Sequence, residues 1–177
     1  TYGDEPNLDS DDRLRGFQDT GKSRFAFDLE VETATHKPTG PAPEALRNVT
    51  DIGLVEKRGA AGGEAGIQHD AFVFRVSQPT QVDIEVVVTN IMQGTEYEDD
   101  DSILFLFDDQ GKLIARDDDG GDNYASRIQT DLPYAGRYYA AVATYGDDVE
   151  LSENDVLEGF DDDGRSRFEF QLVVDIQ

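Results

Sequence analysis

The sequence predicts an all-β protein, an antiparallel jelly-roll-like β-sandwich. Several segments of six to eight residues alternate apolar and polar side chains, which is typical of strands with one buried face. Turn-forming Gly and Asp residues separate these segments, and no long stretch shows a helical period. In addition, the N-terminal β segment duplicates the C-terminal strands of the same chain.

The alternating segments place the strands in chain order. Strands are expected at residues 25–32, 71–76, 82–88, 103–107, 113–115, 137–143 and 168–174. The run Ile-Leu-Phe-Leu-Phe at 103–107 is continuously apolar, which indicates a strand covered on both faces. Residues 59–66, Gly-Ala-Ala-Gly-Gly-Glu-Ala-Gly, lack the Lys-Ser/Thr ending of a phosphate-binding loop. A flexible hairpin or bulge is expected there instead.

Residues 1–34 are a second copy of residues 144–177, with 17 of 34 positions identical at a constant offset of 143. A fixed period of this kind indicates a tandem repeat array. We therefore expect residues 1–34 to be the tail-like strand segment of a preceding repeat, in a segment or processed product of a longer protein. Residues 35–46 are rich in proline and predict a stiff linker, and residues 47–177 then form the complete sandwich.

The charge balance limits the partners of this chain. It has 39 acidic and 15 basic residues, a net charge of −24. Binding to nucleic acid depends on Lys and Arg at phosphates, so no nucleic acid is expected. No stretch approaches the roughly 20 apolar residues that span a bilayer, so no membrane insertion is expected. Two interpretations of the excess acid stay open: a solvated surface suited to high salt, and calcium binding.

Two aspartate-rich loops are the best candidates for calcium, which prefers carboxylate and carbonyl oxygens on tightly curved loops. One is residues 117–123, Asp-Asp-Asp-Gly-Gly-Asp-Asn, and the other is residues 99–101, Asp-Asp-Asp. Antiparallel pairing of 103–107 with 112–116 would bring the two loops together. Residues 147–148 and residues 161–163 are further candidates. Of the second group, Asp162 matches Asp19 in the repeat. The predicted ligands are Asp99, Asp101, Asp117, Asp119, Asp122 and Asp162; the alternative is a solvated turn.

Nothing in the sequence indicates catalysis. The chain has no Cys, and its two histidines, His36 and His69, have no Gly-x-Ser-x-Gly motif beside them. Neither histidine has a second His or Cys at ligand spacing, which argues against zinc. We therefore expect this segment not to be an enzyme.

Three local patterns resemble the bacterial pre-peptidase C-terminal (PPC) domain family. They are His-Asp-Ala-Phe-Val-Phe-Arg-Val at 69–76, the apolar strand with its turn and following strand at 101–115, and Ala-Gly-Arg-Tyr-Tyr-Ala-Ala-Val at 135–142. The resemblance implies a jelly-roll-like sandwich, secreted and non-catalytic, of the kind that accompanies extracellular proteases. The segment 151–165 departs from the family's compact pattern.

Together these observations predict a non-catalytic, calcium-stabilised structural repeat of an extracellular or cell-surface protein. Its partners would be neighbouring copies of the same repeat, in a tandem array or in a filament where residues 1–34 complete the sheet of another subunit. The alternative is an accessory module of a secreted protease or hydrolase that binds substrate or carbohydrate. The sequence Asn48-Val49-Thr50 matches the acceptor for a glycan at Asn48, a pattern that also occurs by chance.

Overall fold

The computed structural model describes residues 6–8, 14–17, 42–46 and 49–177. The chain divides into two compact units, Thr1–Ala34 and Thr35–Gln177, which are described separately. The strand predicted at 25–32 and the sequon residue Asn48 lie outside the described residues. No helix capable of crossing a membrane occurs in the described parts of the chain.

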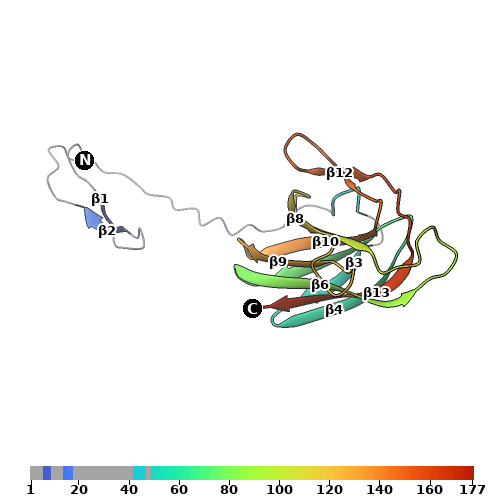
Figure 1. Cartoon of the computed structure of the whole chain (residues 1–177). Coiled ribbons are helices and arrows are strands. Elements are labelled where there is room, and N and C mark those ends of the chain that lie inside the picture. The colour runs from blue at the N-terminus through green and yellow to red at the C-terminus, as the bar shows by residue number, and fades with distance from the viewer. Residues whose placement is uncertain (1–5, 9–13, 18–41, 47–48) are drawn as a thin grey trace. The chain divides into compact units, whose positions relative to one another are not determined.

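The second unit is built on two main β-sheets, as the sequence predicts, with a separate two-stranded hairpin beside them (Figure 1). The five-stranded sheet has the order β3 (Thr50–Leu54), β5 (Asp70–Val76), β10 (Gly136–Thr144), β7 (Ser102–Phe107), β8 (Leu113–Asp117). The four-stranded sheet has the order β4 (Arg58–Ala65), β13 (Phe168–Ile176), β6 (Thr80–Ile91), β9 (Arg127–Leu132). Neighbouring strands in both sheets are antiparallel, except that β3 runs parallel to β5. The all-β architecture is therefore confirmed.

The main core lies between the two sheets and is rich in phenylalanine. Phe72 and Phe74 of β5 and Phe168 and Phe170 of β13 are all buried, and the rings of Phe72 and Phe170 meet edge to face at 5.7 Å. Burying a Phe side chain contributes about 1.5–3 kcal/mol, so these rings are a large part of what holds the sheets together.

A second apolar cluster covers the outer face of the five-stranded sheet. Every residue of β7 is buried, which confirms the prediction of a strand covered on both faces. The cover comes from a hairpin formed by β11 (Val149–Leu151) and β12 (Leu157–Phe160), together with Leu46 from the end of the predicted linker. The segment 151–165 therefore supplies part of this outer layer.

The prediction of a flexible hairpin or bulge at 59–66 is wrong, because residues 59–65 belong to β4, which pairs along its length with β13. The glycines permit close packing. A Cβ atom on Gly63 would lie 2.7 Å from the ring of Phe170 and 2.8 Å from that of Phe72. A Cβ atom on Gly59 would lie 2.7 Å from Ile52. Pairing with β13 and contact with the core thus override the low strand propensity of glycine.

The first unit contains a hairpin of β1 (Pro6–Leu8) and β2 (Leu14–Phe17). Its register is the register of β11–β12 shifted by the repeat offset of 143: Pro6 pairs with Phe17 as Val149 pairs with Phe160. Both hairpins also have an irregularity at the same step of the ladder. The two copies of the repeat therefore share the same local backbone structure in this hairpin.

Candidate functional site

The two aspartate-rich loops predicted to bind calcium meet at one edge of the five-stranded sheet. Leu104 of β7 pairs with Asp117 at the end of β8, so the loop before β7 lies beside the loop after β8. This confirms the hairpin pairing expected from the sequence. We call the two loops, residues 99–101 and 117–122, the acidic rim.

Asp101 lies where the charges of the acidic rim are most crowded. Its carboxyl group is half-buried, and this burial, followed by the charges of Asp99, Asp119, Asp118 and Asp100, raises its pKa to about 6. Like charges that approach one another in this way favour protonation or a bound cation. The rim therefore has an electrostatic demand for positive charge.

Other predicted ligands in the rim shape the loops. The Oδ1 atom of Asp117 accepts hydrogen bonds from the backbone N–H groups of Gly120 (2.7 Å) and Arg127 (2.8 Å). Asp122 is exposed, and its backbone carbonyl accepts a hydrogen bond from the following turn. Asp99 accepts a hydrogen bond from the hydroxyl group of Ser166. In the described residues, no three rim carboxylates bring ligand atoms within 4.8 Å of one another.

A different cluster does meet that condition. Ligand atoms of His69, Asp147 and Asp162 all lie within 4.8 Å of one another, and no other group of three does so in the described part of the chain. His69 precedes β5, Asp147 lies between β10 and β11, and Asp162 follows β12. Of the predicted ligands, only Asp162 belongs to this group. Asp147 was a weaker candidate, and His69 was not predicted as a ligand.

This cluster is far more buried than the acidic rim. The exposed fraction is 1% for His69 and 2% for Asp147. Neither side-chain oxygen of Asp147 accepts a hydrogen bond of standard geometry. Burial, followed by the nearby carboxylates of Asp161 and Asp162, raises the pKa of Asp147 to about 7, and the backbone amide of Asp162 opposes this rise only in part.

Ring stacking and loop geometry position the three side chains. The imidazole of His69 stacks on Phe160 at the end of β12, with ring centroids 3.6 Å apart and 19° between the planes. Gly146, with φ 96°, turns the chain into Asp147, and Asp162 itself has a left-handed φ of 51°. A non-glycine residue in that region costs energy and often marks a functional position. The side chain of Asp161 accepts a hydrogen bond of 2.7 Å from the amide of Asp148, which ties the two loops together.

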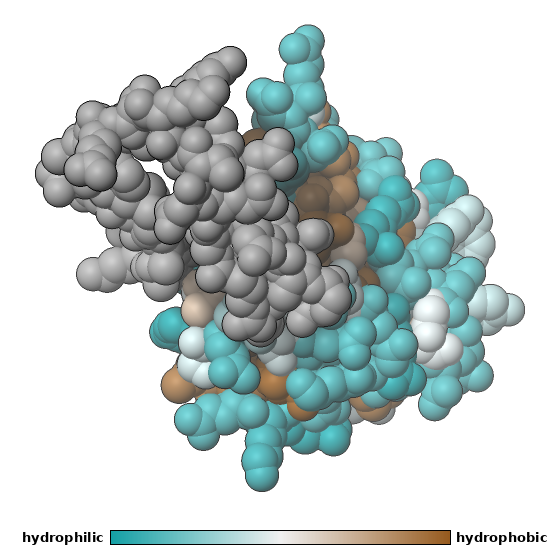
Figure 2. Space-filling model, turned by 90° about the vertical axis from the view of Figure 1, so that its left-hand side faces the viewer, coloured by the Kyte–Doolittle hydropathy of each residue, from teal (hydrophilic) through white to brown (hydrophobic). Residues whose placement is uncertain are grey.

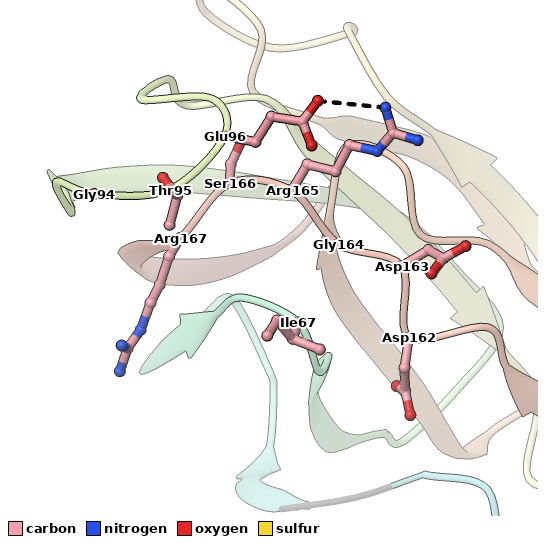
Figure 3. A pocket seen from close by; sticks show the side chains of 10 residues that line it. All are labelled: Ile67, Gly94, Thr95, Glu96, Asp162, Asp163, Gly164, Arg165, Ser166 and Arg167. Atoms are coloured by element: carbon pink, nitrogen blue, oxygen red, sulfur yellow. Dashed lines mark ion pairs between the residues drawn. The ribbon is translucent and has the colours of Figure 1, made fainter.

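Two cavities have Asp162 in their lining. One, of about 290 Å³, is lined by His69 and Asp162 together with two further acidic residues, Glu44 and Glu158. The other, of about 600 Å³, lies between residues 94–96 and 162–167 and is drawn in Figure 3. There the carboxylates of Asp162 and Asp163 point in different directions, although the residues are adjacent. Two members of the cluster, His69 and Asp162, thus border a cavity whose lining is acidic.

The described residues on the face shown in Figure 2 are mainly hydrophilic, with small hydrophobic areas between them. This agrees with the net charge of −24. Among the exposed aromatic residues, Tyr97 and Tyr145 lie together in a T-shaped pair with centroids 5.9 Å apart.

Comparison with known proteins gave no match among curated proteins but did find similar solved structures. The pre-peptidase C-terminal domain of a collagenase from Bacillus anthracis is 16% identical, with a TM-score of 0.45, over 77% of this chain and 98% of that one. Two PliG proteins, periplasmic inhibitors of g-type lysozyme from Aeromonas hydrophila and Salmonella Typhimurium, are each 14% identical, with TM-scores of 0.40. They cover 73% and 72% of this chain and 98% of their own. The model of the bacterial pre-peptidase C-terminal domain family matches residues 68–144, the region in which the sequence motifs lie.

Proposed function

We propose that this chain is a non-catalytic accessory module of an extracellular or cell-surface protein, stabilised by calcium at the acidic rim. The family match to residues 68–144 supports the module. The repeated hairpins β1–β2 and β11–β12 support an arrangement of several such modules in one protein.

The observation that carries the calcium proposal is the crowding of carboxylates around Asp101. Burial is the largest cause of its raised pKa, and the charges of four neighbouring acidic side chains raise the pKa further. A calcium ion takes six to eight oxygen ligands from carboxylates, carbonyls and water. It would neutralise these charges and join the loop before β7 to the loop after β8. The module would then be more rigid when calcium is present.

The test is thermal unfolding of the whole chain after treatment with a chelator, with and without millimolar calcium. A ligand at a hundred times its Kd stabilises the folded state by about 2.7 kcal/mol, which is a rise of several degrees in Tm. The double variant D101N/D119N should lose this rise. Magnesium, and sodium chloride at matched ionic strength, are the controls for screening. An equal rise in sodium chloride alone would contradict calcium binding.

The proposal includes neighbouring copies of the repeat as partners. In the second unit, β13 is paired on both sides, with β4 and with β6 of the same chain. The position that a donated copy would take is therefore filled from within the chain, which favours a tandem array over strand exchange. Light scattering on chains with and without residues 1–34 distinguishes these arrangements. Only strand exchange requires the number of chains in each particle to fall when residues 1–34 are removed.

A further inference from the structure

The cluster of His69, Asp147 and Asp162 is independent of the acidic rim and calls for its own explanation. The three residues are separated by 78 and 15 positions in the sequence, yet their ligand atoms lie within 4.8 Å of one another. They come from the start of one strand and from the two ends of the β11–β12 hairpin. A ligand held by all three would therefore fasten the hairpin to the five-stranded sheet.

Asp147 is the reason to expect a cation there. Its exposed fraction is 2%, and neither carboxylate oxygen accepts a hydrogen bond of standard geometry. None of the ion pairs among the described residues involves it, and the nearby Asp161 and Asp162 are also acidic. Burying a carboxylate without a partner costs several kcal/mol. A metal ion supplies both the missing charge and the missing bonds.

The donor atoms indicate which kind of metal. Calcium takes oxygen ligands, whereas an imidazole nitrogen suits zinc and related transition metals. One histidine and two carboxylates provide three of the four positions of a tetrahedral zinc site, and the fourth can be water from the 290 Å³ cavity. Bonds of about 2.0 Å in a tetrahedron place ligand atoms about 3.3 Å apart, so the side chains would draw together on binding.

The internal repeat provides a second line of evidence. Asp147 and Asp162 match Asp4 and Asp19, and Phe160, which stacks on His69, matches Phe17. By contrast, the neighbours of Asp162 on either side are not retained, because residues 161 and 163 match Gln18 and Thr20. Of three consecutive aspartates, the repeat therefore keeps the one that reaches the cluster.

From this geometry we infer that His69, Asp147 and Asp162 form a zinc-binding site that fastens the β11–β12 hairpin to the start of β5. Phe160 holds the imidazole in place by stacking, and Glu44 and Glu158 attract the ion to the adjacent cavity. The metal has a structural role, closing the outer layer of the module.

The experiment measures zinc binding to the whole chain by isothermal titration calorimetry, after removal of metals and in excess calcium so that the acidic rim is saturated. Cobalt substitution gives a second readout, because tetrahedral cobalt absorbs strongly in the visible range. We expect H69Q and D147N each to weaken zinc binding at least tenfold and to abolish the cobalt absorption. The matched controls H36Q, which changes the other histidine, and D163N, which changes an exposed neighbour of Asp162, should bind like the unmodified chain.

Two results would overturn the zinc site: the unmodified chain binding zinc no more tightly than H69Q, or H36Q losing as much affinity as H69Q. Circular dichroism checks that each variant is folded, and D162N serves as a third ligand variant if D147N does not fold. The calcium-dependent rise in Tm should persist in H69Q. A chain that does not bind zinc therefore leaves the calcium proposal intact. A chain without a calcium-dependent rise in Tm likewise leaves the zinc proposal intact.

Discussion

Two aspartates of this protein are almost equally buried but have opposite surroundings. Asp83 on β6 has an exposed fraction of 8%, and Asp147 has 2%. Asp83 accepts hydrogen bonds from Arg127 (2.8 and 2.6 Å) and Gln129 (2.8 Å), and Arg127 is the main reason why its pKa is lowered. Asp147 has no such donors, and burial raises its pKa to about 7. Burial alone therefore does not reveal the role of a carboxylate.

The difference lies in what completes each group. The charge of Asp83 is balanced by side chains of the adjacent strand β9, so the fold needs nothing further there. The charge of Asp147 faces other acids and a histidine, and none of the ion pairs among the described residues involves it. The first aspartate is therefore part of the scaffold, and the second belongs to the site that we propose.

The largest expected effect comes from replacing each aspartate by asparagine in the metal-free protein. D83N should lower the free energy of unfolding by about 2 kcal/mol, because the guanidinium of Arg127 loses its charged partner. D147N should leave stability unchanged or raise it, because it removes a buried charge that has no partner. Urea unfolding measures both. An equal loss in the two variants would show that the carboxylates are equivalent after all.

Of Asp83 and Asp147, only Asp83 should lose a stabilising contribution on acidification. Its pKa is lower in the folded state than in the unfolded state, so the folded form binds its proton more weakly. The stability it provides is complete above its unfolded pKa of about 3.8 and is lost as the pH falls through the folded value. The difference in unfolding free energy between the unmodified chain and D83N should therefore shrink below about pH 4. A difference that is constant with pH would exclude ionic pairing as the cause.

A smaller effect is expected for R127K, which keeps the positive charge but not the planar pair of donors. Arg127 contacts both oxygens of Asp83 through two different nitrogens. Lysine can offer only a point charge, and the side chain of Arg127 is partly exposed. The expected loss in the free energy of unfolding is therefore about 1 kcal/mol. Urea unfolding of R127K beside D83N measures it. A loss as large as that of D83N would indicate that geometry, more than charge, holds this pair.

Much of the scaffold could be predicted because it depends on local alternation. The segments 71–76, 82–88 and 137–143 became β5, β6 and β10, with their alternate residues in the core. The strand β4 could not be predicted, because Gly59 and Gly63 are explained only by the rings and strands that pack against them. The strand β9 could not be predicted either, because three consecutive polar residues, 129–131, separate its two buried apolar residues, Ile128 and Leu132.

The buried cluster was harder to predict than the rim. The rim is formed by the two ends of one hairpin. That its two loops lie close together could therefore be inferred from the spacing of residues 99–101 and 117–119. The cluster needs three segments that are distant in sequence, and His69 carries no local motif. The retention of Asp4 and Asp19 in the repeat was a usable signal for its two carboxylates. No comparable signal existed for the histidine, since the repeated segment does not include it.

The outer layer also determines how the module responds to tension. Leu46, near the entrance of the second unit, packs in the same cluster as Leu157 of β12, and Gly111 accepts a hydrogen bond of 2.9 Å from the amide of Leu157. A pull transmitted through the preceding residues thus reaches this layer before it reaches the ladders of the sandwich. We therefore expect the β11–β12 hairpin to yield first under tension, while the sheets behind it remain intact.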